Sequence, residues 1–312
     1  MTQEPPLTSH VSRITPPPML TNAQIQIRDP FVLPVPEEGV YYLFGTTNKD
    51  PWRGGEGFDC YRGRDLEHWD GPFPAFRPPP GFWSDREFWA PEVHRFNGRW
   101  YMFASFKMPQ VCRGTQILVA DRPEGPYRPH SDGPVTPRDW ECLDGTLHVD
   151  ADGTPWLVFC HEWVQIGDGG MCALPLTPDL KAAADAPITL FHASAAPWAA
   201  RFENREVGQL GYGIVTDGPF LFRAQDGALL MLWSSLGKEG YAMGVARAAS
   251  GRVTGPWEQQ AEPVFAKDGG HGMLFRTFDG RLLMTLHCPN RTPDERPVFL
   301  PVKETGTTLR RL

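Results

Sequence analysis

The chain has 312 residues, of which 33 are proline, 32 are glycine and 41% are hydrophobic. So many helix-breaking residues are typical of short strands joined by turns, not of a helical protein. The net charge is −7, and acidic and basic residues are interspersed along the whole chain. This balance argues against nucleic acid as a partner.

The first 21 residues are polar and rich in proline, and they contain no apolar stretch that would serve as the core of a secretory signal. No segment is long and apolar enough to span a membrane. The six cysteines form no CxxC pair and no zinc-like spacing, so we expect reduced and mostly buried thiols. We therefore predict a cytoplasmic protein without a membrane partner.

After this segment, one pattern recurs five times: an apolar strand, a glycine turn and a second apolar strand. A third apolar segment follows, and in three units it leads to a Gly-Pro-aromatic turn before an expected fourth strand. The turn glycines, 53 to 74 residues apart, are Gly39, Gly98, Gly153, Gly227 and Gly280. Four antiparallel strands repeated at this period indicate the blade of a β-propeller. A parallel β-helix or two stacked sandwiches would also use many short strands, but regular units of this length favour the propeller.

The sequence thus predicts an all-β fold, a five-bladed propeller formed by residues 27–312 as a single catalytic domain, with residues 1–26 as an N-terminal extension. The longest interval places extra chain at residues 195–215, between blades three and four. The fourth strand of the last blade is hard to place, so we expect the N-terminal segment to supply it. The expected blade boundaries lie near Asp29, Phe88, Cys142, Thr216 and Gly270.

Charged residues open most of the five units. In an up-and-down blade, the starts of first strands and the ends of second strands meet on one face. A single Asp at a strand start commonly caps a turn, but three at equivalent positions of a ring would repel one another, which favours a functional pocket. The opening residues are Asp29, Ala90, Asp144, Asp217 and His271. Converging carboxylates suit hydrolysis of a glycosidic bond, in which a protonated acid serves the leaving oxygen and an ionised one activates water.

Four ordered motifs resemble those of family 43 glycoside hydrolases. They are Arg28-Asp29-Pro30, Phe88-Trp89-Ala90-Pro91-Glu92, Leu143-Asp144-Gly145-Thr146 and Thr216-Asp217-Gly218-Pro219. The resemblance implies a five-bladed propeller that hydrolyses terminal arabinosyl or xylosyl residues of oligosaccharides, or in some cases galactosyl residues, with inversion.

Carried over by position, the resemblance makes Asp29 the general base and Asp144 the modulator of the acid's pKa. Asp217 stands where the family normally has the general acid Glu, and it is one methylene shorter. Three possibilities follow: Asp217 is itself the acid, Glu206 or Glu162 replaces it, or the propeller binds sugar with little hydrolysis.

Aromatic side chains would form the sugar platform, since the C–H faces of sugar rings stack on them. Trp89 is the first candidate because it lies beside a strand start. The other expected substrate contacts lie near strand ends on the same face: Phe31, Phe106, His161 and Ser234. His271 matches a family histidine near the channel centre, which implies a possible calcium ion held through its water shell, with no other cofactor required.

Overall fold

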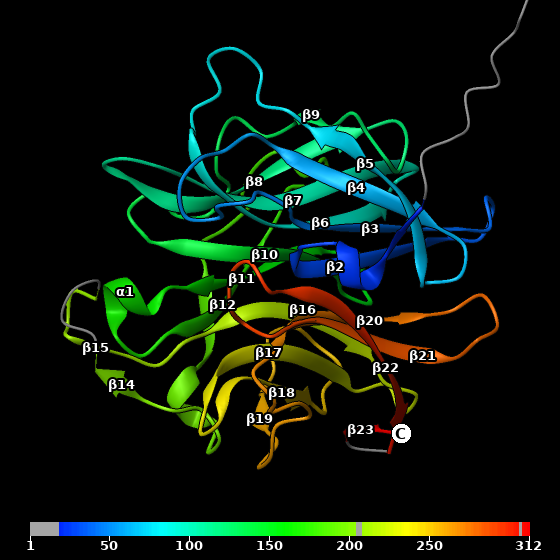
Figure 1. Cartoon of the computed structure of the whole chain (residues 1–312). Coiled ribbons are helices and arrows are strands. Elements are labelled where there is room, and N and C mark those ends of the chain that lie inside the picture. The colour runs from blue at the N-terminus through cyan, green and yellow to red at the C-terminus, as the bar shows by residue number, and fades with distance from the viewer. Residues whose placement is uncertain (1–18, 204–207, 306–307) are drawn as a thin grey trace, which may run out of the picture.

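The computed structural model describes residues 19–203, 208–305 and 308–312. Within these ranges the chain forms five antiparallel sheets arranged around one axis, as the repeat predicts (Figure 1). Each sheet is a blade, and its strands follow one another in chain order from the centre outwards, except for β1 at the outer edge of blade one.

The strands of each blade are as follows. Blade one contains β2 (Arg28–Val35), β3 (Val40–Thr46), β4 (Phe58–Gly63) and β5 (His68–Phe76), with β1 (Leu20–Thr21) at its outer edge. Blade two contains β6 (Arg86–Phe96), β7 (Arg99–Met108), β8 (Val111–Ala120) and β9 (Arg128–Pro129). Blade three contains β10 (Cys142–Val149), β11 (Pro155–His161), β12 (Gly170–Pro175) and β13 (Ile188–His192). Blade four contains β16 (Asp217–Arg223), β17 (Leu229–Gly237), β18 (Gly240–Ala248) and β19 (Glu258–Gln259). Blade five contains β20 (Gly270–Arg276), β21 (Leu282–Cys288), β22 (Arg296–Glu304) and β23 (Leu309–Arg311).

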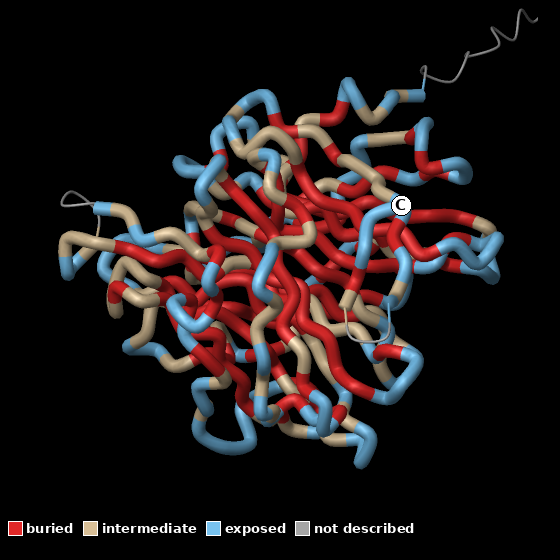
Figure 2. Tube along the Cα trace, turned by 90° about the horizontal axis from the view of Figure 1, so that it is seen from below, coloured by how far each residue is buried: buried red, intermediate tan, exposed pale blue. Residues whose placement is uncertain are grey.

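The first strands β2, β6, β10, β16 and β20 form a closed ring, in which each contacts the first strands of both neighbouring blades. Every residue of β3 is buried because each sheet packs against another blade on both faces. Figure 2 shows the resulting distribution, with buried chain at the centre and exposed loops around it. Hydrophobic residues of successive blades therefore form the core.

The ring does not close as the sequence suggested. All four strands of blade five come from the C-terminal part of the chain, and β1 pairs with β5 at the outside of blade one. Blades one and five instead meet through side chains and backbone around Glu295. Its carboxylate accepts a hydrogen bond from Arg28 at 2.8 Å, and its carbonyl accepts one from the Ile27 amide at 3.3 Å. The prediction of a borrowed N-terminal strand in the last blade is wrong.

Phe106 lies in the core and not at the pocket. It has no exposed surface, and its ring packs edge-to-face against Phe88 at 4.8 Å and against Phe82 at 5.1 Å between blades one and two. Its position at the end of a second strand suggested a substrate contact, but its side chain points between the sheets. Phe106 therefore contributes to packing alone.

The extra chain between blades three and four forms a short helical turn, η2 (Ala193–Ala195), and a two-stranded pair, β14 (Phe202–Glu203) with β15 (Tyr212–Gly213). It packs against the short helix α1 (Trp163–Ile166), where the rings of Trp163 and Phe202 lie 4.9 Å apart. A further short helix, η1 (Asn22–Gln24), precedes blade one. No helix among the described residues is long and apolar enough to cross a membrane. All six cysteines are free thiols, and four of them are buried.

Candidate active site

Every first strand contains a β-bulge close to its start, and this bulge sets the geometry of the site. The pairing register shifts by one residue after Arg28, Trp89, Leu143, Asp217 and Gly270. The next residue in each strand has a positive φ, an uncommon conformation for residues other than glycine. These residues are Asp29 (54°), Ala90 (47°), Asp144 (58°), Gly218 (53°) and His271 (46°).

Asp217 is therefore not equivalent to Asp29 and Asp144, as the sequence suggested, but lies one residue earlier in its strand. Gly218 occupies the equivalent position, and a Cβ atom there would lie 2.6 Å from the His271 ring. Because that position has no room for a side chain, the carboxylate of blade four comes from the preceding residue.

A ring of hydrogen bonds links the bulges to neighbouring blades. The amides of Ala90, Asp144 and His271 donate to the hydroxyls of Thr46, Ser105 and Ser234, at 2.9, 2.8 and 2.8 Å. The Asp29 amide donates to His287 Nδ1 at 3.1 Å. In the remaining blade, Gly218 donates its amide to Asp144 Oδ2 at 3.0 Å. Each bulge is thus tied by its amide to the preceding blade of the ring.

The bulged ends enclose a pocket of about 70 Å³ on the axis. Its floor is polar and its wall on one side is aromatic. The lining residues are Arg28, Asp29, Pro51, Trp52, Trp89, Leu143, Asp144, Asp217, Tyr241 and His271. The pocket therefore brings together all three aspartates and the histidine that the sequence singled out.

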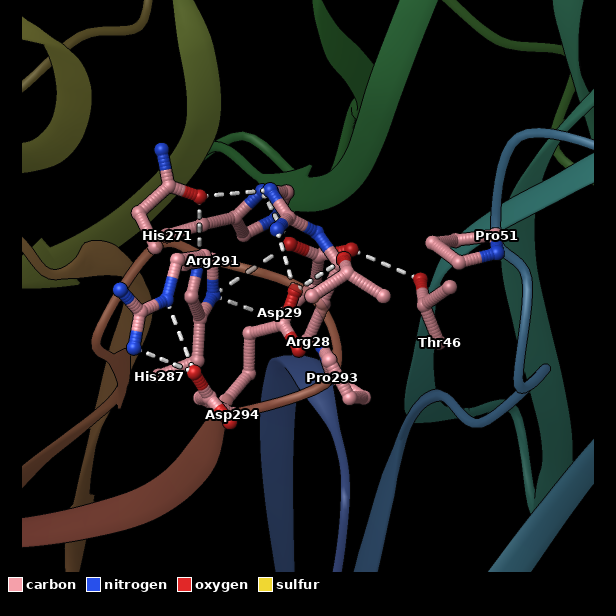
Figure 3. A network of polar contacts seen from close by, with 12 residues as sticks. Arg28, Asp29, Thr46, Pro51, His271, His287, Arg291, Pro293 and Asp294 are labelled. Atoms are coloured by element: carbon pink, nitrogen blue, oxygen red, sulfur yellow. Dashed lines mark hydrogen bonds and ion pairs between the residues drawn. The ribbon is translucent and has the colours of Figure 1, made fainter.

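Asp29 lies between a histidine and a threonine (Figure 3). His271 Nδ1 is 3.1 Å from its Oδ1, and the Thr46 hydroxyl donates to its Oδ2 at 2.7 Å. Burial acts to raise the pKa of Asp29, but the electrostatic effects of His271 and Arg28 and the Thr46 hydrogen bond outweigh it, and the pKa lies below its ordinary value. Asp29 is therefore a carboxylate at neutral pH.

His287 supports Asp29 as a neutral imidazole. Its Nδ1 accepts the Asp29 amide, so its other nitrogen carries the proton and donates to Asn290 Oδ1 at 3.1 Å. Burial and the nearby Arg28 guanidinium lower the pKa of His287 to about 3. The side-chain oxygen of Asn290 also holds Arg28, because Arg28 Nη2 donates to this Oδ1 at 2.7 Å.

The other two aspartates are shifted in the opposite direction. Burial and the charge of Asp29 raise the pKa of Asp144 well above its ordinary value. Burial and the charge of Asp144 raise the pKa of Asp217 to about 7, although a hydrogen bond from Tyr241 works against this rise. The Tyr241 hydroxyl donates to Asp217 Oδ2 at 2.9 Å. Of the three carboxyls in the pocket, Asp29 thus has a lowered pKa, whereas Asp144 and Asp217 have raised ones. The ionised Asp29 and Asp217, which binds a proton near neutral pH, form the pair that acid–base chemistry requires.

Trp89 forms the aromatic wall and is held on three sides. Its indole N–H donates to the Pro51 carbonyl at 2.5 Å, and its ring meets Trp52 edge-on at 5.2 Å. The guanidinium of Arg113 lies 4.1 Å from its ring centroid. Arg113 forms ion pairs in turn with Glu162 and Glu87.

Comparison with known families gives one match that spans most of the chain. Residues 22–308 match the model of Glycosyl hydrolases family 43. The chain belongs to glycoside hydrolase family 43. Members of this family include arabinanases, arabinofuranosidases and xylosidases.

Two solved structures illustrate the relationship. The endo-arabinase from Bacteroides thetaiotaomicron is 40% identical, with a TM-score of 0.86, and the match covers 93% of this chain and 99% of that one. An endo-1,4-beta-xylanase from the same organism shares the fold at 23% identity, with a TM-score of 0.72 and coverage of 94% and 96%. A curated relative, Xylosidase/arabinosidase 43A of Humicola insolens, is 26% identical over 81 residues, which are 26% of this chain and 24% of that protein.

Several residues proposed from the sequence do not line the pocket. Phe31 is buried and packs edge-on against His94 at 5.3 Å. Ser234 is fully buried and accepts the His271 amide, so it positions the histidine. His161 stacks on Trp140 at 4.2 Å, away from the pocket. The side chains of these three residues are engaged with other residues outside the pocket: Phe31 also meets Phe220 of blade four at 6.4 Å, and His161 is 2.7 Å from Gln165 Oε1.

Glu162 and Glu206 were the two alternative candidates for the general acid. The carboxylate of Glu162 is buried and paired with Arg113, and it does not line the pocket. Glu206 lies outside the described residues. Within the described part of the chain, Asp217 is therefore the carboxyl that meets the pocket in blade four.

The described residues contain no group of three or more His, Cys, Asp or Glu side chains arranged to hold a metal ion. His271 Nδ1 faces Asp29 and lies 3.5 Å from Asp144 Oδ2, so this nitrogen is engaged with carboxylates. The site does not fit calcium bound directly by side chains, and the expectation of an ion held through water stays a prediction.

Sequence reasoning missed Arg28, Trp52 and Tyr241 as pocket residues. Arg28 directly precedes Asp29 in a motif that was already singled out, which is a signal that could have found it. Trp52 lies on the loop between β3 and β4, and Tyr241 is the second residue of β18, the third strand of its blade. Neither position belongs to the strand starts or second-strand ends from which the pocket was predicted.

Proposed function

We propose that this protein is an inverting glycoside hydrolase that cleaves α-L-arabinosyl linkages in arabinan-derived oligosaccharides. The observation that carries the mechanism is the pair of carboxyls with opposite pKa shifts in one pocket, Asp29 below its ordinary value and Asp217 at about 7. The 40% identity to an endo-arabinase supports arabinosyl over xylosyl substrates.

In the proposed reaction, the Asp29 carboxylate takes a proton from a water molecule, whose oxygen attacks the anomeric carbon. The bond from that carbon to the leaving oxygen breaks on the opposite face, and Asp217 gives its proton to this oxygen. The step ends with Asp29 protonated and Asp217 ionised, and proton exchange with solvent restores both. The product sugar has the inverted anomeric configuration.

Asp144 and His271 tune this pair. The charge of Asp144 raises the pKa of Asp217, which keeps the acid protonated. His271 lies between Asp29 and Asp144 and lowers the pKa of Asp29. Trp89, Trp52 and Arg28 would contact the sugar from the pocket wall.

The pH dependence of kcat/KM follows from these shifts. The base must be ionised, so activity falls only as pH drops below the ordinary range of an aspartate. The acid must be protonated, so activity falls as pH rises through about 7. We expect a bell-shaped profile with its upper limb near pH 7, set by Asp217.

The test compares Asp29→Asn and Asp217→Asn with the wild type on arabino-oligosaccharides, 4-nitrophenyl α-L-arabinofuranoside and the matching β-D-xyloside. We expect each substitution to lower kcat on arabino-oligosaccharides by about 10²–10⁴-fold, and the first product seen by proton NMR to be the inverted anomer. Asp132→Asn, in an exposed loop, is the matched control. Unchanged hydrolysis in Asp29→Asn would refute the mechanism.

A second function, sugar binding without turnover, rests on one observation: Asp217 stands where the family resemblance places Glu. An acid misplaced by about 1 Å can cost on the order of 10²-fold in rate. Calorimetry with arabino-oligosaccharides, followed by product analysis of the same samples, separates the two functions. Binding with no product under any pH tested would favour the second function.

A further inference from the structure

Tyr241 meets the side chain that we propose as the acid, and no motif pointed to it. It is the second residue of β18, the third strand of blade four. Its hydroxyl donates to Asp217 Oδ2 at 2.9 Å. Its side chain is buried and lines the pocket. The acid and its hydrogen-bond donor therefore come from one sheet.

The ring of Tyr241 has close neighbours on two sides. It stacks on the neutral His287 imidazole, with ring centroids 5.7 Å apart and planes 20° from parallel. Gly270 lies so close on another side that a Cβ there would be 2.7 Å from Tyr241 Cε1. The backbone is fixed as well, since its carbonyl accepts the Gly269 amide at 2.9 Å. A phenol held in this way directs its hydroxyl to one place.

Tyr241 donates this hydrogen bond to Asp217 Oδ2. Burial and the charge of Asp217 raise the pKa of Tyr241 well above its ordinary value, so the phenol keeps its proton and can donate it. Because Asp217 Oδ2 accepts, we assign the proton of the neutral acid to Oδ1.

We propose that Tyr241 is a positioning residue for proton transfer: its hydroxyl fixes Oδ2 of Asp217, so that the shorter acid presents its proton on Oδ1 to the leaving oxygen. This inference rests on the proposed function, because it assigns Tyr241 a part in the step that Asp217 performs. It also accounts for a chain that uses Asp where the family resemblance places Glu.

Removal of the hydroxyl has a defined electrostatic effect. The hydrogen bond stabilises ionised Asp217, so its loss raises the pKa of the acid and moves the upper limb of the pH profile to higher pH. Other charged groups act on Asp217 in both variants, and they come from blades three and five. They are Asp144 and Glu162, which raise the pKa, and His271, which lowers it.

The test is Tyr241→Phe, measured on two arabinosides whose leaving groups need an acid to different degrees. A 2,4-dinitrophenyl arabinofuranoside has a leaving group that departs without a proton, whereas arabinobiose requires one. We expect kcat to fall about 10- to 100-fold on arabinobiose and less than about threefold on the dinitrophenyl glycoside. An equal loss on both substrates would overturn the proposal, since a disturbed fold or pocket lowers both.

Tyr42→Phe is the matched control, because its buried hydroxyl also donates to a carboxylate, Glu38 Oε2 at 2.7 Å, and it does not line the pocket. We expect it to leave both rates and the pH profile unchanged. Asp217→Asn separates the two proposals. If it shows no dependence on the leaving group, the acid assignment fails; if it does and Tyr241→Phe does not, only the role of Tyr241 fails.

A second measurement needs no turnover. In protein with ¹³C-labelled aspartate carboxyls, the signal lost in Asp217→Asn identifies the acid, and its titration is followed by NMR. We expect Tyr241→Phe to raise the midpoint of this titration, while Tyr42→Phe leaves it unchanged. An unchanged midpoint in Tyr241→Phe would overturn the proposal even if the protein hydrolysed none of the substrates.

Discussion

The opposite pKa shifts of Asp29 and Asp217 make opposite predictions for folding stability. The pKa of Asp217 is raised from its ordinary 3.8 to about 7. Between these values the unfolded chain ionises the group and the folded protein does not, so the folded state loses relative stability as pH rises. Replacement by the neutral isostere Asn removes this loss.

The magnitude follows from the raised pKa. A rise from 3.8 to about 7 corresponds to about 4 kcal/mol of unfolding free energy above pH 7. The Asp217 carboxyl lines a pocket, so screening by solvent reduces this free energy. We expect Asp217→Asn to be more stable than the wild type by about 2–4 kcal/mol at pH 8. The difference should shrink steadily as pH falls from 7 to 4.

Asp29→Asn should behave in the opposite way. The pKa of Asp29 is lowered in the folded protein, so its carboxylate contributes stability that is present above pH 4 and is lost as pH falls through the folded-state value. Asp29→Asn should therefore be less stable than the wild type at pH 7. One variant gains stability and the other loses it, although both lose activity.

Urea unfolding followed by tryptophan fluorescence from pH 4 to 8 measures both effects, with Asp132→Asn as the exposed control. An Asp217→Asn variant that is no more stable than the wild type at pH 8 would refute the assignment of a neutral, buried acid. A gain that does not change with pH would refute it too, because it would reflect packing and not ionisation.

Three further predictions concern two residues that support the pocket and one residue of the core. Thr46→Val removes a hydrogen bond from the Asp29 carboxylate, so the acid limb of the kcat/KM profile should move up by about one pH unit. Arg113→Met removes the cation from the Trp89 face, and we expect steady-state kinetics to show KM rising by up to about 10-fold with partial rescue in Arg113→Lys; an unchanged KM would contradict this. Phe106→Ala should cost about 3–5 kcal/mol in urea unfolding while KM of the folded enzyme stays the same, because the ring packs in the core.

Much of the architecture was predictable because it depends on local patterns. Each blade is a run of short strands separated by glycine turns, and hydrogen bonding between neighbours in the chain leaves few other ways to pair them. The predicted boundaries near Asp29, Phe88, Cys142, Thr216 and Gly270 therefore lie within two residues of the first strands observed. The closure of the ring was not predictable in this way, because blades one and five are joined through Arg28 and Glu295, 267 residues apart.

The pocket wall was predicted less well than its floor. Strand ends indicate which residues lie on one face, but they do not indicate which side chains point to the axis. Phe106 and Ser234 lie at strand ends, as Trp89 does at a strand start, yet both are buried between blades. Tyr241 reaches the axis from a third strand because Gly270 leaves room beside its ring.

The strand pattern of the sequence places acidic residues near the start of several blades, and it therefore predicts that carboxylates converge on one face. The differences between these carboxylates depend on contacts that exist only in the folded protein. A bulge gives Asp29 and Asp144 a positive φ, whereas Asp217 lies one residue earlier because the His271 ring excludes any side chain at position 218. That displacement brings Asp217 to Tyr241, whereas Asp29 lies beside His271. Their pKa values move apart because a carboxyl responds to the charges and donors around it, and those neighbours are assembled only when the ring closes.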